Sequence, residues 1–198
     1  QEQRAGRRVV AFGTTNGSFE PLDGLKPLGI AVLAEELRAQ ARDTVRFFQD
    51  EGVELKVMSG DAPETVGAIA RDAGIEGQAL TGDAPVDELV GASVVGRISP
   101  EGKKAVVEAL RDRGRYVAMV GDGVNDVPAL KASRLAIAQG SGSEMARSVA
   151  DVVLVNGDFA AVPEMVAQGR KILRNLQRVT KLFAAKSAFA AFLILSIG

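Results

Sequence analysis

The segment 119–131 contains residues whose types and spacing suit the binding of a hard metal ion. Asp122, Asn125 and Asp126 place two carboxylates and one amide within five residues, with no basic residue between them. Glycines on both sides of Asp122 permit a tight turn, and oxygen ligands of this kind are those that Mg²⁺ prefers. The alternative interpretation is an ordinary surface turn, which uses Gly, Asn and Asp for their backbone tolerance.

The composition of the chain narrows the possible chemistry. The sequence contains no cysteine and no histidine, which excludes disulfides, thiolate zinc sites and imidazole-based catalysis. Any metal must therefore be held by oxygen atoms, and catalysis must use carboxylates, hydroxyls, amides, Lys or Arg. The 24 basic and 25 acidic residues leave a net charge of −1, so no basic excess indicates a nucleic-acid partner.

Strands and helices alternate along the sequence and must position the metal-binding segment. The predicted strands are Val9–Gly13, Leu28–Leu33, Val53–Met58, Ser93–Ile98, Tyr116–Val120, Leu135–Ala138 and Val152–Val155. The predicted helices are Leu37–Asp50, Pro63–Asp72, Ser99 to about Arg113, Val127–Ser133, Ser143–Val149 and a long helix from about Ala160. This alternation predicts an α/β fold, a Rossmann-like parallel sheet with helices on both faces. Functional sites in such sheets lie at the carboxyl ends of strands, and the apolar run Tyr116–Val120 predicts a buried central strand.

The C-terminal end of the chain has a different character. Every residue from Ser187 to Gly198 is apolar or small, and these twelve residues would span about 18 Å as a helix. That length is short of the roughly 30 Å of a bilayer core, so the stretch predicts the start of a transmembrane helix. The polar beginning at Gln1, without an initiator Met, leads us to expect a piece of a longer protein.

The string GDGVNDVPALK, which begins at Gly121, is very similar to the signature of the P-type ATPases. These enzymes are a branch of the haloacid-dehalogenase-like superfamily. The resemblance implies that Asp122 is a Mg²⁺ ligand and that Asp126 supports the metal. It also implies that Asn125 supports the metal and phosphate site. ATP and Mg²⁺ are the cofactors that the resemblance implies.

Two further segments resemble motifs of the same family. Lys56–Asp61 resembles its Thr-Gly-Asp motif, which implies that the Ser59 hydroxyl and the Gly60 amide bind phosphoryl oxygens and that Asp61 contacts the nucleotide or the hinge. The string RISPEGK resembles an Arg-x-Ser-Pro-x-x-Lys motif. It implies that Lys103 neutralises charge near the phosphorylated aspartate.

Four further features near these motifs also receive an interpretation. The neighbour of Lys103, Lys104, is expected to face solvent. A second Thr-Gly-Asp string at 81–83 is interpreted as a decoy, because no convincing strand precedes it. The segment 35–38 resembles a weakened Asp-Pro-x-Arg hinge, and 151–154 resembles the final strand of the family's phosphorylation domain.

The resemblance divides the chain into three parts and implies its role. Residues 1–33 resemble the tail of a nucleotide-binding domain and a return link. Residues 34–175 resemble the larger part of a phosphorylation domain without its first strand, and 176–198 resemble the entry into a truncated transmembrane helix. An intact family member is a multi-pass protein of the cell membrane that moves a cation through an aspartyl-phosphate intermediate, with this portion mostly cytoplasmic. The nucleophile belongs to an Asp-Lys-Thr-Gly-Thr motif that this sequence lacks, so the chain alone is expected to be inactive.

Two alternatives stay open at this stage. A stand-alone haloacid-dehalogenase-like phosphatase needs a nucleophilic Asp at the end of an N-terminal strand, whereas VVAFGTT offers none and Asp23 lacks that strand context. A non-catalytic regulatory module would keep the sheet and use the apolar tail as an anchor. For the pump interpretation, the expected partners are ATP, a lipid bilayer and a transported cation. The residues in and around the motifs resemble those of bacterial cation pumps, and we expect Ca²⁺ as that cation.

Overall fold

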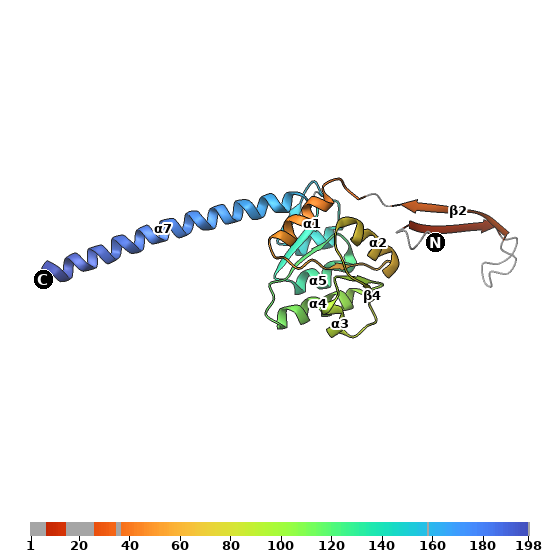
Figure 1. Cartoon of the computed structure of the whole chain (residues 1–198), viewed down its shortest axis with the longest axis horizontal. Coiled ribbons are helices and arrows are strands. Elements are labelled where there is room, and N and C mark those ends of the chain that lie inside the picture. Colours follow the sequence, from red (N-terminus) through yellow and green to blue (C-terminus); the bar gives the residue numbers. More distant parts are fainter. Residues whose placement is uncertain (1–6, 15–25, 35–36, 158, 198) are drawn as a thin grey trace. The chain divides into compact units, whose positions relative to one another are not determined.

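The computed structural model describes residues 7–14, 26–34, 37–157 and 159–197. The chain divides into two compact units, Gln1–Phe159 and Ala160–Gly198. The first unit contains the strands and the short helices, and the second contains the helix α7 (Ala161–Ile197) (Figure 1).

Six short strands of the first unit form two parallel sheets of three strands each. One sheet has the order β3-β5-β4, and the other has the order β6-β7-β8. The strands are β3 (Val57–Met58), β4 (Ala79–Thr81), β5 (Val94–Gly96), β6 (Ala118–Gly121), β7 (Leu135–Gln139) and β8 (Val152–Leu154). The helices are α1 (Ala41–Asp50), α2 (Pro63–Ala73), α3 (Val86–Gly91), α4 (Pro100–Asp112), α5 (Val127–Ala132) and α6 (Glu144–Val149). A separate antiparallel hairpin pairs β1 (Arg7–Thr14) with β2 (Lys26–Ala34).

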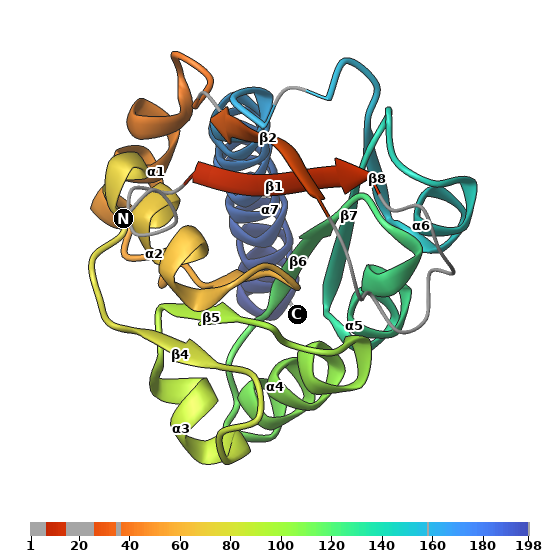
Figure 2. The same ribbon diagram turned by 90° about the vertical axis from the view of Figure 1, so that its right-hand side faces the viewer.

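Helix α4 joins the cores of the two sheets. Its neighbouring residues Val106 and Val107 are both almost fully buried, but they pack into different clusters. Val106 lies with Val95 of β5, and Val107 lies with Met119 of β6. Met58 of β3 packs against both clusters. The sheets, which lie beside each other in Figure 2, therefore share one hydrophobic layer, and the predicted α/β fold is confirmed.

The prediction that the strand at 116–120 is buried and central is wrong for the described residues. Among these, β3 pairs only with β5 and β6 pairs only with β7, so both are edge strands. Tyr116 is 75% exposed, and β3 includes only the last two residues of the strand predicted at 53–58. A strand needs a hydrogen-bonding neighbour to extend, and both strands lack one on their outer side within the described part of the chain.

Local signals set most of the helix boundaries. Helix α2 begins at Pro63 and ends before Gly74, whose φ of 94° is left-handed, as the sequence predicts. Helix α4 follows Ser99, whose hydroxyl accepts a hydrogen bond from the Gly102 amide at 3.0 Å. Helix α1 begins only at Ala41, four residues later than predicted, and its N-cap Gln40 makes no capping hydrogen bond through its side chain.

Helix α7 confirms the long C-terminal helix that the sequence predicts. Its 37 residues span about 55 Å at the usual helical rise. Within the described residues it is the helix that is long and apolar enough to cross a membrane. This property rests on length and composition.

Candidate functional site

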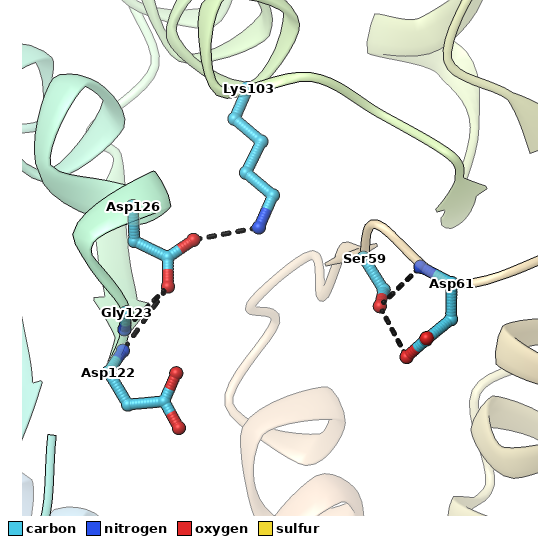
Figure 3. A network of polar contacts seen from close by, with 6 residues as sticks. All are labelled: Ser59, Asp61, Lys103, Asp122, Gly123 and Asp126. Carbon is cyan, nitrogen blue, oxygen red and sulfur yellow. Dashed lines mark hydrogen bonds and ion pairs between the residues drawn. The ribbon is translucent and has the colours of Figure 1, made fainter. Parts of the chain in front are cut away.

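The carboxylate of Asp126 organises the loop that follows β6. One of its oxygens, Oδ2, accepts hydrogen bonds from the backbone amides of Asp122 and Gly123, each at 3.2 Å. The other, Oδ1, lies 2.7 Å from the Nζ atom of Lys103 (Figure 3). Asp126 is only 7% exposed, so a buried ion pair and two amide contacts hold the loop in one conformation.

Gly121 is required where β6 ends, because the Asp126 side chain crosses directly over it. A Cβ atom on Gly121 would lie 2.6 Å from the Cβ atom of Asp126. We therefore expect Gly121→Ala to lower the free energy of unfolding by about 1–3 kcal/mol, the usual cost of overpacking. The control is Gly91→Ala in α3, where nothing lies within 4 Å of the added Cβ atom. Urea unfolding of both variants measures the difference, and equal midpoints would contradict the expected clash.

Asp122 has a fixed backbone and a free carboxylate. Its carbonyl oxygen accepts a hydrogen bond of 2.7 Å from the Ser143 amide, and Gly142 packs so closely that a Cβ atom there would lie 2.6 Å from the same oxygen. Its side chain is exposed and makes no hydrogen bond or ion pair with a described residue. A carboxylate that is held in place but unpaired suits a divalent cation.

The chain offers few ligands for a complete metal site by itself. No group of three or more acidic side chains that could hold a metal occurs among the described residues. Both oxygens of Asp126 already have partners, whereas Asn125 is exposed. The donor set fits Mg²⁺, which is usually bound through one or two carboxylates together with water and substrate phosphates.

The two neighbouring lysines of α4 differ as the sequence predicts. Lys103 is 9% exposed and makes the buried ion pair with Asp126. Lys104 is half exposed and lies 3.5 Å from Glu108 on the surface of the same helix. Of these two lysines, only Lys103 therefore contributes positive charge beside the metal-binding loop.

Ser59, Gly60 and Asp61 form a second loop at the carboxyl end of β3. The Ser59 hydroxyl accepts a hydrogen bond from the Asp61 amide and donates one to the Asp61 carboxylate, both at 3.2 Å. Gly60 is exposed, and its amide has no hydrogen-bond partner among the described residues. In Figure 3 Ser59 and Asp61 lie on one side of the view, and Lys103, Asp122 and Asp126 lie on the other.

Arg97 connects the second loop to helix α4, and sequence reasoning gave this residue no role. Its amide donates a hydrogen bond of 2.7 Å to the Asp61 carbonyl. The amide of the next residue, Ile98, donates to the Ser59 carbonyl at 3.1 Å. Arg97 has a φ of 49°, a left-handed conformation that is costly for a residue with a side chain. The sequence signal that could have identified Arg97 is its place as the first residue of the Arg-x-Ser-Pro-x-x-Lys motif.

Three further sequence interpretations concern the surroundings of the site. The expectation that no strand precedes the string at 81–83 is wrong, because Thr81 is the last residue of β4; its interpretation as a decoy stays a prediction. Residues 35–36 of the hinge-like segment lie outside the described residues, while Arg38 donates a hydrogen bond to the Gly157 carbonyl. Asp151, at the predicted final strand, accepts a hydrogen bond of 2.8 Å from the Ala136 amide and so ties β8 to β7.

Known proteins resemble this chain over most of its length. A family model described as a haloacid dehalogenase-like hydrolase matches residues 4–134. The calcium-transporting ATPase CtpE of Mycolicibacterium smegmatis is 37% identical over 205 residues, which cover 98% of this chain and 26% of that protein. The copper-exporting P-type ATPase of Mycobacterium tuberculosis is 36% identical over 174 residues, which cover 88% of this chain and 21% of that protein.

A solved structure agrees with these sequence similarities. The crystal structure of a zinc-transporting PIB-type ATPase in its E2.Pi state is 27% identical, with a TM-score of 0.66. The match covers 89% of this chain and 25% of the solved chain. The chain therefore spans about a quarter of the length of the proteins it resembles.

Proposed function

Because this chain belongs to the haloacid dehalogenase-like hydrolases and its curated relatives are P-type cation-transporting ATPases, we propose that it surrounds the phosphorylated aspartate of an ATP-driven cation pump. The observation that carries this proposal is the arrangement around Asp126. It holds Lys103 by an ion pair and holds the backbone of Asp122 by an amide contact. The Lys103 ammonium and the Asp122 carboxylate, which would hold a metal ion, can then both stabilise the charge of a phosphoryl group, as phosphoryl transfer requires.

Several groups of the site would stabilise a phosphoryl group, each in a different way. The Lys103 ammonium neutralises negative charge on the transferring oxygens, and the Ser59 hydroxyl and Gly60 amide donate hydrogen bonds to them. Bound Mg²⁺ would neutralise further charge on the same group. Asp122 would hold that ion, and Asp126 would support the metal site through its contacts with Lys103 and the loop amides, while Asp61 and Asn125 contact the nucleotide and its phosphates.

The attacking carboxylate comes from a strand that lies between β3 and β6. Among the described residues, β3 and β6 each have one edge without a hydrogen-bonding neighbour, which supports this placement. Met58 and residues of α4, which pack against the cores of both sheets, support it as well. A parallel strand inserted there would make one continuous sheet. Its carboxyl end would lie between Ser59 and Asp122, because functional residues collect at that edge. The strand belongs to the part of the pump that this chain does not span.

The reaction at that carboxylate proceeds in two steps. A carboxylate oxygen attacks the γ-phosphorus of ATP, the bond to the β-phosphate oxygen breaks, and ADP leaves. Water then attacks the phosphorus of the aspartyl phosphate, releasing inorganic phosphate and restoring the carboxylate. In the pump these steps drive cation movement across the membrane through helices that include α7. The calcium-transporting relatives support Ca²⁺ as the ion, although copper and zinc pumps are also similar.

The purified 198-residue chain is expected to form no acid-stable phosphoenzyme with γ-labelled ATP, because it lacks the attacking carboxylate. The full-length pump that contains this chain is expected to become labelled, and Ca²⁺ dependence of that label would check the ion. Acid precipitation followed by autoradiography measures both. Labelling of the isolated chain would refute the division of the site between two segments, and an unlabelled full-length protein would refute the pump function.

The phosphatase and regulatory alternatives are less well supported. A phosphatase would need a nucleophilic carboxylate at this site. Among the described residues, the only carboxylates that belong to the two loops or bond to them are those of Asp61, Asp122 and Asp126, which already have other proposed roles. A purely regulatory module would not need a buried lysine that pairs with Asp126 while the Asp122 carboxylate stays exposed.

A further inference from the structure

Helix α7 has an excess of basic over acidic residues. Six basic residues lie between positions 170 and 186, and no acidic residue follows Glu164. Arg174, Arg178 and Lys181 are spaced by four and three residues, so they lie on one face of the helix. We call these three residues the basic stripe. All three are exposed and make no hydrogen bond or ion pair with another described residue.

The opposite face of the same helical turns is apolar. Ile172, Leu176, Val179 and Phe183 are also spaced by four and three residues, and each is about half exposed or more within the described chain. A basic face opposite an apolar face is the pattern of helices that lie at a membrane surface. The apolar face is the one suited to other segments of the pump, which leaves the basic stripe directed away from them.

The position of the basic stripe relative to the apolar end determines what it can contact. The apolar run begins at Leu182, immediately after Lys181, and Lys186 is its one charged residue. Seven residues separate Arg174 from Lys181, which is about 10 Å along a helix. The headgroup layer of one leaflet is about 5–8 Å thick, and charge is felt for about 8 Å beyond it at physiological salt. The whole stripe therefore lies within reach of headgroup charge.

We propose that the basic stripe, Arg174, Arg178 and Lys181, binds the phosphate groups of anionic phospholipids in the leaflet that α7 enters. This inference rests on the proposed membrane role of α7. Each basic residue near an anionic surface strengthens binding, and guanidinium groups match phosphate geometry well. The contact fixes the depth and rotation of the helix that leads from the phosphorylation site into the membrane.

The test measures partition of the full 198-residue chain from dilute detergent onto sedimentable vesicles. Vesicles of phosphatidylcholine alone report insertion of the apolar end. Replacing about a third of the lipid by phosphatidylglycerol is expected to raise the partition coefficient on the order of a hundredfold for three basic residues. High salt is expected to remove that gain, because it screens surface charge.

The triple variant Arg174→Gln/Arg178→Gln/Lys181→Gln is expected to lose most of the gain and to keep its binding to phosphatidylcholine. The matched control is Arg46→Gln/Arg71→Gln/Arg134→Gln, which removes the same charge from exposed positions of the first unit. An equal gain in both triple variants would overturn the proposal, and absence of any phosphatidylglycerol effect would instead assign the stripe to an acidic protein segment. Absence of binding to all vesicles would refute the membrane role of α7 itself.

Discussion

Replacing Asp122 by Asn in the full-length pump is expected to lower the rate of phosphoenzyme formation by at least about a hundredfold, the usual cost of losing one preorganised charge-stabilising group. The substitution keeps the size of the side chain and leaves the backbone contacts of Asp122 with Asp126 and Ser143 intact. It removes the negative charge that would hold Mg²⁺. The measurement is the rate of acid-stable labelling from γ-labelled ATP at saturating Mg²⁺.

The matched control for this experiment is Asp83→Asn. Asp83 is another exposed carboxylate at the carboxyl end of a strand, two residues beyond β4, and it makes no hydrogen bond or ion pair with a described residue. Its removal is expected to change the labelling rate less than about twofold. Mn²⁺ binding, followed by electron paramagnetic resonance, should weaken only in the Asp122 variant. Wild-type labelling in that variant would eliminate Asp122 as the metal ligand.

The substitution Lys103→Met is expected to lower the stability of the first unit by about 3–5 kcal/mol. Removing one partner of a buried ion pair leaves the other charge uncompensated, and this is the cost usually measured. Asp126 would keep its two amide contacts but lose the ammonium at 2.7 Å. Native-state hydrogen exchange of the amides in α4 and β7 measures this loss without interference from α7.

Two companion variants make the result for Lys103 specific. Lys104→Met removes a cation from the next position, where the ion pair with Glu108 is half exposed, so it should cost no more than about 1 kcal/mol. The double variant Lys103→Met/Asp126→Asn removes both charges and should be more stable than Lys103→Met alone. If the two lysine variants are equally stable, the buried pair does not hold the loop.

The parts of the site that depend on local signals were predictable from the sequence. Glycines beside Asp122, the Pro63 and Gly74 boundaries of α2 and the Ser99 cap of α4 each act over a few residues. The choice of Lys103 over Lys104 follows from the Arg-x-Ser-Pro-x-x-Lys spacing, and the structure buries Lys103 and leaves Lys104 half exposed.

The features that depend on contacts between distant segments of the chain could not be predicted from local sequence patterns. Strand β4 has three residues and gains its conformation from β5, which lies thirteen or more residues further along the chain. The shortness of β3 and the exposure of Tyr116 agree with the strand proposed between β3 and β6, which is not among the described strands. The strained Arg97 depends on the loop at Ser59–Asp61, which comes more than thirty residues earlier. No local pattern contains this information.

The open outer edges of β3 and β6 also have a consequence for biosynthesis. In the proposed pump, the strand that joins them lies outside these 198 residues, so both edges stay unpaired until the two segments meet. Pairing over a long sequence separation is slow, and unpaired edges invite aggregation. The nascent pump is therefore expected to need chaperone protection at this stage of its assembly.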